Sequence, residues 1–369
     1  MSAMQSITST IAPRTDMELH QPKDGLLYLN VCHESAKEYQ RLSSILRYAR
    51  IVLQGMSLVF DNDTGSRLPH PDANPYLWSE IAGNILRETI PELAHALRAA
   101  AASEVPAIVV RGLPAEATPA ATPYGGLIDL NESRQAIINL YGVIECLGLT
   151  PIAYETEDVS ILHAVAPRPD AGGLEASIGF DKKLPFHTDY ADRPMTEAVT
   201  DLSPAAHALA FAVERPEPLV PMECLPVTKV VDQLTEAEKS VAQQEAFEIL
   251  APDIFRSQRR PCARPLLIAD GNGGFYCRLN LAKTTPVTAA ARSLVSRLHN
   301  LLAETQALPI GVLRGDIVVF HNSRVLHRRS SFRPRWDGTD RYFIRMSLVR
   351  RGSRQRGLAR DPARPWLWR

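Results

Sequence analysis

Short apolar runs separated by turn signals fill the second half of the chain, and this alternation limits the folds open to it. Such runs suit β-strands better than helices, which need longer periodic stretches. Asp270–Gly274 (DGNGG) joins two of them and is a strong hairpin signal. The runs expected to be strands are Val159–Val165, Leu184–His187, Ala208–Val213, Pro265–Ala269, Phe275–Leu281, Gly311–Phe320 and Tyr342–Val349. The pattern predicts a mainly β fold of the jelly-roll type, with helices packed outside.

Helical patterns gather before this region and interrupt it twice. Apolar residues recur at helical spacing over 36–56, 77–102 (with a break near Pro91) and 133–147, and again over 235–250 and 287–306. A short apolar run, Ala107–Arg111, is expected to be a buried strand.

These patterns predict a simple organisation. Residues 1–25 are expected to be a flexible N-terminus, and 26–350 a single domain. Within it we expect a helical part over about 26–105 and the jelly-roll core over about 106–350. Residues 351–369 are rich in arginine and are interpreted as a solvated basic tail.

Composition excludes several classes of function. Lys+Arg and Asp+Glu both number 41, so no global field favours nucleic acid or an acidic membrane surface. The five cysteines are scattered, which favours free thiols in a reducing compartment. No apolar stretch resembles a signal peptide or a membrane span. We therefore expect a cytoplasmic protein without nucleic-acid or membrane partners; the oligomeric state is left open.

Two metal-ligand candidates stand at the end of a predicted strand, in Phe186-His187-Thr188-Asp189-Tyr190. Side chains at i and i+2 of a strand share a face, so His187 and Asp189 can point at one ion. Taken alone, an HxD triplet is more often an ordinary polar strand end.

A third candidate, His327, ends the segment Gly315–His327, which begins as a Gly-Asp turn and a buried strand and ends in a polar bend. Two histidines and one carboxylate on one face of a metal form the triad of non-haem iron oxygenases, which leaves three coordination sites open. Two of these sites suit a bidentate keto acid, and the third suits O2. His321 is the rival for the distal ligand, but its spacing to Arg341 fits less well.

Two arginines follow on the next predicted strand. Arg341 comes after the turn Asp337–Asp340 and can bind the distal carboxylate of a keto acid through two hydrogen bonds. Arg345 lies on the same strand face and is a candidate for the substrate carboxylate. Each of them alone is more often a surface ion-pair residue.

Together these segments resemble the clavaminate synthase-like branch, also called TauD-like, of the Fe(II)/2-oxoglutarate oxygenases, which includes amino-acid hydroxylases. The matching pieces are Ala107–Pro114, His163–Pro167, Leu184–Asp189 and Gly315–Arg345. The resemblance implies a double-stranded β-helix core, iron on His187, Asp189 and His327, and 2-oxoglutarate on Arg341. It also implies that Arg345 holds the carboxylate end of the substrate.

The chain departs from this family at two positions. Many amino-acid hydroxylases of the branch have HxE where this chain has HTD, and Asp189 is an equally competent ligand. Members often place a threonine near the keto acid, where the nearest register here gives Met222-Glu223. No second 2-oxoglutarate contact is therefore assigned.

The expected activity is hydroxylation of an unactivated C–H of a free polar L-amino acid, coupled to decarboxylation of 2-oxoglutarate to succinate. Asn280, on a plausible pocket wall without an acid, favours a neutral side chain such as that of citrulline over arginine or lysine. Asp270 nearby weakens this preference. Two alternatives stay open: a taurine-dioxygenase-like enzyme acting on another small acid, and a non-catalytic sensor of keto acids or amino acids.

Overall fold

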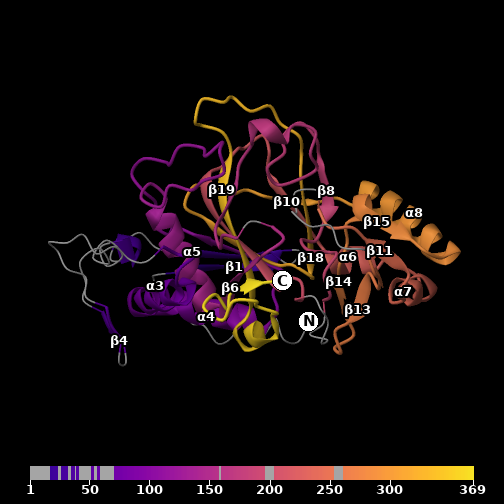
Figure 1. The fold of residues 1–369 in the computed structure, drawn as a ribbon, viewed down its shortest axis with the longest axis horizontal. Coiled ribbons are helices and arrows are strands. Elements are labelled where there is room, and N and C mark those ends of the chain that lie inside the picture. The colour runs from indigo at the N-terminus through magenta and orange to yellow at the C-terminus, as the bar shows by residue number, and fades with distance from the viewer. Residues whose placement is uncertain are drawn as a thin grey trace.

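Two β-sheets facing each other form the centre of the molecule in a computed structural model (Figure 1). It describes residues 17–23, 26–31, 35–37, 39–40, 51–53, 56–58, 70–157, 159–195, 203–252 and 261–369. The main sheet runs in the order β1 (Met17–Lys23), β2 (Leu26–Val31), β5 (Ala107–Arg111), β17 (Ile317–His321), β9 (Ala208–Arg215), β19 (Tyr342–Arg350), β6 (Leu149–Tyr154) and β20 (Leu367–Trp368), with β7 (His163–Val165) paired to β19. The second sheet runs β16 (Leu308–Ile310), β10 (Met222–Pro226), β18 (Val325–Arg329) and β8 (Leu184–His187).

The central strand β9 shows how the sequence fills both faces of the main sheet. Leu209, Phe211 and Val213 belong to a cluster that also holds Met222 and Cys224 of the second sheet. Ala208, Ala210 and Ala212 alternate with them and face the helices. The small alanine side chains let α5 (Arg134–Cys146) lie close to the sheet. Each large apolar side chain buried here stabilises the fold by about 1.5–3 kcal/mol.

Helices cover the outer face of the main sheet. α3 (Pro75–Thr89) begins at Asn74, whose side chain accepts a hydrogen bond from the Leu77 amide at 3.1 Å. α4 (Pro91–Ala102) begins at the proline that ends α3, so the predicted break near Pro91 is confirmed. The predicted helix at 133–147 is confirmed as α5.

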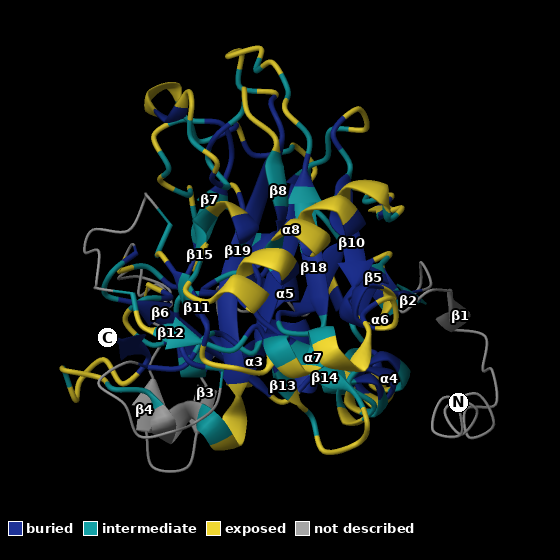
Figure 2. Ribbon diagram, turned by 90° about the vertical axis from the view of Figure 1, so that its right-hand side faces the viewer, coloured by how far each residue is buried: buried dark blue, intermediate teal, exposed yellow. Residues whose placement is uncertain are grey.

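Smaller elements cover one end of the second sheet. They are α6 (Val227–Val231), α7 (Glu236–Ala242), α8 (Ala289–Glu304), a sheet of β12 (Ala263–Arg264), β11 (Phe247–Ile249) and β15 (Thr284–Pro286), and the hairpin β13 (Leu267–Ala269)–β14 (Phe275–Cys277). Short 3₁₀ turns lie elsewhere along the chain, at Pro169–Ala171, Leu281–Lys283 and Arg351–Arg356, the last of them directly after β19. Figure 2 shows buried strands at the centre and an exposed outer side of α8. Within the described ranges, no helix is both long and apolar enough to cross a membrane.

The N-terminal predictions need correction. Residues 17–23 form a strand, so the flexible N-terminus expected over 1–25 is wrong at its end. Residues 26–31 are a strand of the main sheet, paired parallel to β5, although the region was expected to be helical. β2 pairs with the preceding β1 on one side and with β5, about eighty residues away in the chain, on the other, and local periodicity does not reveal the distant partner.

The helix expected over 36–56 is wrong at its C-terminal end. β3 (Ile51–Leu53) and β4 (Met56–Leu58) form an antiparallel pair there, which suits the β-branched Ile51 and Val52. Residues 35–37 and 39–40 are helical, and 41–50 lie outside the described part.

Several strands are shorter than predicted. The run Gly311–Phe320 is a turn until Ile317, since Gly315 adopts a φ of +87° that only glycine tolerates well. The run Val159–Val165 is extended only at 163–165, and the run Phe275–Leu281 only at 275–277. The helix expected over 235–250 ends at residue 242 and is followed by β11.

The last residues contradict the interpretation of 351–369 as a solvated tail. Leu367 and Trp368 form β20, which pairs parallel to β6. Trp366 and Trp368 are buried, and Trp368 packs against Tyr154. Burying two indole rings and a leucine outweighs the pull of the neighbouring arginines towards water.

Candidate metal centre

Two paired strands bring His187 and His327 together. His187 ends β8, and His327 lies directly opposite it in β18. Their ring centroids are 4.2 Å apart. The sequence predicted a polar bend at His327, but the residue lies within a strand, which fixes the direction of its side chain more firmly.

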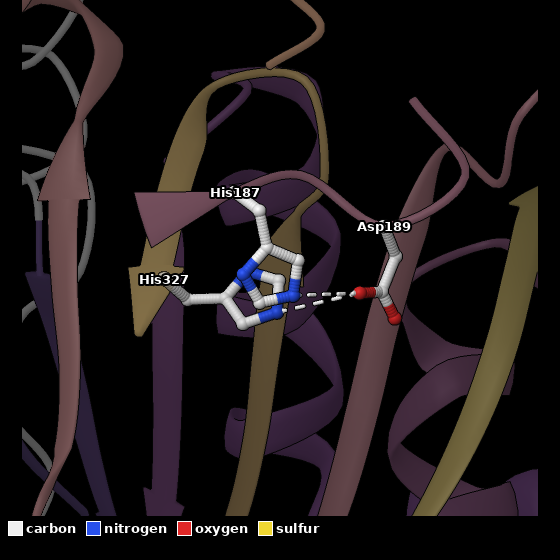
Figure 3. A group of neighbouring side chains, drawn as sticks. All are labelled: His187, Asp189 and His327. Atoms are coloured by element: carbon white, nitrogen blue, oxygen red, sulfur yellow. Dashed lines mark ion pairs between the residues drawn. The ribbon is translucent and has the colours of Figure 1, made fainter. Parts of the chain in front are cut away.

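Asp189 completes the cluster from the loop that follows β8 (Figure 3). Its Oδ1 lies 3.2 Å from Nε2 of His187 and 3.5 Å from Nε2 of His327. The three ligand atoms lie within 4.8 Å of one another, and no other such group of His, Cys, Asp or Glu occurs among the described residues. The structure therefore brings together all three residues that the sequence singled out.

The donor atoms suit a divalent transition metal. Nδ1 of His187 lies 2.8 Å from the Pro185 carbonyl, and donation there leaves the Nε2 lone pair free for an ion. Burial alone would raise the pKa of Asp189, but in the metal-free protein hydrogen bonds from His187 and His327 and the charge of Arg345 hold it well below its usual range. Two imidazole nitrogens and one carboxylate oxygen are a set that fits Fe(II), with room for further ligands.

Asn322 holds the backbone of the metal-binding loop. Its side-chain oxygen accepts a hydrogen bond from the Asp189 amide at 2.9 Å, and its Nδ2 donates to the Asp189 carbonyl at 2.9 Å. Thr188 is tied to Leu279 by its own amide at 2.8 Å and by its hydroxyl. Asn322 was not among the residues predicted from the sequence, although its place between His321 and His327 in a polar segment was a signal.

Arg345 lies against acidic residues. One nitrogen donates to Asp189 Oδ2 at 2.9 Å, and another forms an ion pair with Glu157. Glu157 also accepts a hydrogen bond from the Tyr190 hydroxyl at 2.6 Å. Burial lowers the pKa of Arg345, but the negative charges of Glu157 and Asp189 and the hydrogen bond to Glu157 outweigh this effect and raise it. The sequence assigned Arg345 to the substrate carboxylate and missed Glu157, which lies far away in the chain.

Arg341 is buried at the start of β19 and has no carboxylate partner in the described part of the chain. Its guanidinium packs 4.0 Å from the ring centre of Phe343, and its Nε has no hydrogen-bond partner. Glu217 acts on it only at a distance, because that carboxylate is bound to Arg335. Burial and the nearby Arg329 lower the pKa of Arg341 to about 9.

One cavity, with an empty volume of about 970 Å³ including open solvent, connects these groups. His187, Asp189, His327, Arg341 and Arg345 all line it. Asn280 lines it too, and its backbone pairs with that of His187.

Two further charged residues of the cavity wall, Asp192 and Arg329, were not predicted from the sequence. Asp192 is largely buried, and its Oδ1 has no partner among the described residues. Arg329 lies two residues after His327 on the same strand face. Its position was a readable signal, since the i, i+2 rule that pairs His187 with Asp189 applies here as well.

Comparisons with known proteins find relatives among oxygenases. No protein-family model matches the chain. L-asparagine oxygenase of Streptomyces coelicolor is 26% identical over 253 residues, which cover 66% of this chain and 71% of that protein. L-lysine 3-hydroxylase of Catenulispora acidiphila is 26% identical over 67% of this chain and 66% of its own length. Clavaminate synthase 2 of Streptomyces clavuligerus is 29% identical over 68% and 75%.

Solved structures share the fold over nearly the whole chain. Asparagine oxygenase in complex with Fe(II), a hydroxyasparagine and succinate superposes with a TM-score of 0.73 and 22% identity, covering 92% of this chain and 98% of that one. The non-haem iron oxygenase OrfP in complex with Fe and α-ketoglutaric acid gives 0.72 and 18%, covering 93% and 99%.

Proposed function

Because its relatives and fold neighbours make the chain a member of the clavaminate synthase-like branch of the Fe(II)/2-oxoglutarate oxygenases, we propose that it hydroxylates a free polar L-amino acid. The convergence of His187, Asp189 and His327 within one cavity carries this proposal. These three side chains hold the iron. When bound, iron with 2-oxoglutarate and O2 supplies the oxidising chemistry, which yields succinate, CO2 and a hydroxylated substrate.

Arg341 binds the keto acid. A buried guanidinium without a counter-ion is costly, because its charge has lost water and gained no partner. A carboxylate in the cavity would satisfy it through two charge-assisted hydrogen bonds. The arrangement supports the role that the sequence assigned: Arg341 holds the distal carboxylate of 2-oxoglutarate.

Arg345 and Glu157 carry charges complementary to the carboxylate and ammonium groups of a free amino acid. They place a positive and a negative charge side by side in the cavity wall. A free amino acid carries the complementary pair, a carboxylate and an ammonium. We propose that Arg345 receives the substrate carboxylate while it keeps Asp189 ionised, and that Glu157 receives the ammonium.

Asn280 and Asp192, which also line the cavity, are candidates to contact the substrate side chain. The sequence offered Asn280 there and no acid. Asp192 adds a carboxylate whose Oδ1 has no partner among the described residues, and such an atom accepts a hydrogen bond from an amide, ureido, guanidinium or ammonium group. Basic side chains such as those of arginine and lysine are therefore candidates on the same footing as citrulline.

A substrate screen tests the proposal. The protein, reconstituted with Fe(II), is incubated with 2-oxoglutarate, O2 and the standard amino acids plus citrulline, ornithine and taurine. Succinate release and the gain of one oxygen atom are followed by mass spectrometry. We expect one amino acid to be hydroxylated by the wild type and not by His327→Ala. Hydroxylation of taurine alone would favour the small-acid alternative, and binding without succinate release would favour the sensor.

A further inference from the structure

A second arginine, Arg329, is buried in the same cavity as Arg341. It lies on β18 two residues beyond His327, opposite Leu184 of β8, and lines the cavity. Only 4% of its surface is exposed. The iron-binding role of the triad does not account for a full positive charge at this position.

The hydrogen bonds of Arg329 leave its charge uncompensated. It donates to the carbonyls of Ser330 at 2.7 Å and Ala176 at 3.3 Å, and its Nε has no partner. No carboxylate of the described residues forms an ion pair with it. Asp181, the acid that acts on it from a distance, is bound to the Gly173 amide at 2.8 Å.

The neighbouring Arg328 shows how a guanidinium charge in a protein is usually compensated. Arg328 forms a two-point ion pair with Glu223 on the neighbouring strand, with distances of 2.9 and 3.0 Å. Buried or half-buried guanidinium groups are normally satisfied in this way. Arg329 and Arg341 are exceptions among the described residues, and both line the same cavity, where the charge of Arg329 lowers the pKa of Arg341.

A purely structural role explains only part of this arrangement. Holding two carbonyls uses two N–H groups of Arg329 and would be served equally by a neutral donor. Two uncompensated guanidinium groups in one buried cavity are unfavourable unless an anion binds between them. A ligand that relieves both must present an anionic group to these two arginines, and the second carboxylate of a dicarboxylic keto acid is such a group.

We propose that Arg329 and Arg341 together bind the distal carboxylate of the keto acid, so that Arg329 is a second positioning residue for the co-substrate. This inference rests on the proposed function. Arg329 supplies the second contact for which the sequence offered no threonine. A pair of guanidinium groups also makes the cavity selective for a dicarboxylic keto acid over one that lacks the distal carboxylate.

The test measures keto-acid binding rather than turnover. Fe(II)-loaded wild type, Arg329→Met and Arg329→Lys are titrated calorimetrically without O2 or amino acid, once with 2-oxoglutarate and once with 2-oxobutyrate. We expect Arg329→Met to weaken 2-oxoglutarate binding by about ten- to a hundredfold, since a hydrogen-bonded charge is lost. Arg329→Lys should recover part of it. Binding of 2-oxobutyrate should change less than about twofold, because that molecule has no second carboxylate.

Arg297→Met is the control, since Arg297 lies on the exposed side of α8 with one distant partner, Glu238 at 4.0 Å. Equal losses for both keto acids, or no loss for either, would overturn the proposal for Arg329. A wild type that binds 2-oxoglutarate but oxidises nothing would leave this inference standing and remove the proposed function. A wild type that fails to bind 2-oxoglutarate at all would remove both.

Discussion

Two pairs of neighbouring histidine rings stand out among the described residues, and the surroundings of only one of these two pairs suit a metal. The rings of His187 and His327 are 4.2 Å apart, and those of His207 and His321 are 4.3 Å apart. Both pairs join strands that are distant in the chain. The first pair faces Asp189, whereas the second faces cations. Neighbouring histidine rings alone therefore do not identify a metal site; a carboxylate oxygen at ligand distance from both rings, here Oδ1 of Asp189, is the distinguishing feature.

The groups around His207 and His321 explain why this second pair is unsuited to a metal. Arg350 donates to Nε2 of His207 at 3.3 Å, and Tyr276 stacks on His321. The nearest acid, Glu104, is already bound by Arg324 at 2.8 Å and by Arg350. A metal there would meet positive charge and no available carboxylate.

Removing one histidine from each pair should give the largest difference in turnover between the two regions. His327→Ala should lower succinate release by more than about a thousandfold, because the metal loses a ligand. His321→Asn should retain turnover within about threefold. Steady-state kinetics under saturating 2-oxoglutarate would measure the turnover of both variants. A comparable loss in both variants would mean that the second pair takes part in the reaction.

Removing one arginine near each pair tests the anion end of the cavity. Arg341→Met should raise the KM for 2-oxoglutarate by about a hundredfold, since two charge-assisted hydrogen bonds are lost. Arg350→Met, beside the second pair, should leave that KM within about twofold. Initial rates at varied 2-oxoglutarate concentration measure both. The account of Arg341 fails if its KM is unchanged while kcat falls.

Asn322 lies between the two pairs and holds the Asp189 backbone. Asn322→Ala should weaken metal affinity by about tenfold, the usual effect of losing an outer support of a metal ligand. The neighbouring Ser323→Ala is the matched control, because that hydroxyl contacts His321 instead. Competition with a coloured chelator reads out both affinities. Equal affinities in the two variants would show that the loop needs no such support.

The second pair should affect stability rather than turnover. Burial and the charge of Arg350 lower the pKa of His207 to about 4, so the folded state keeps it neutral. The unfolded chain binds a proton near pH 6.5, and the free energy of unfolding should therefore fall by about 2–3 kcal/mol as the pH drops from 6.5 towards 4. His207→Gln should show a smaller fall. Urea denaturation at several pH values tests this, and parallel curves for the two proteins would contradict it.

The same comparison shows what the sequence could predict. Strand alternation led to His187 and Asp189 as a pair, and the structure brings them together although Asp189 lies in the loop just after β8. The turn before β19 was expected to return Arg341 to the same end, and Arg341 lines the same cavity. The choice of His327 over His321 rested on spacing, and the structure explains it: β18 carries His327 opposite His187, while His321 ends β17 in the other sheet.

Other features depend on contacts that no local pattern encodes. Glu157 reaches Arg345 from a distant loop, and Asp192 becomes notable because its Oδ1 has no partner in the described part of the chain. β2 forms because β5 lies beside it, and the C-terminal tryptophans are buried because β6 offers an edge. Hydrophobic periodicity reports which face of an element is apolar, and it does not report which distant element covers that face.

Anaerobic titration with Fe(II), read as the number of ions bound per chain, tests the metal assignment most directly. The account predicts one ion per chain for the wild type and for His321→Asn, and loss of tight binding in His327→Ala and in Asp189→Ala. Unchanged iron binding in His327→Ala would contradict it.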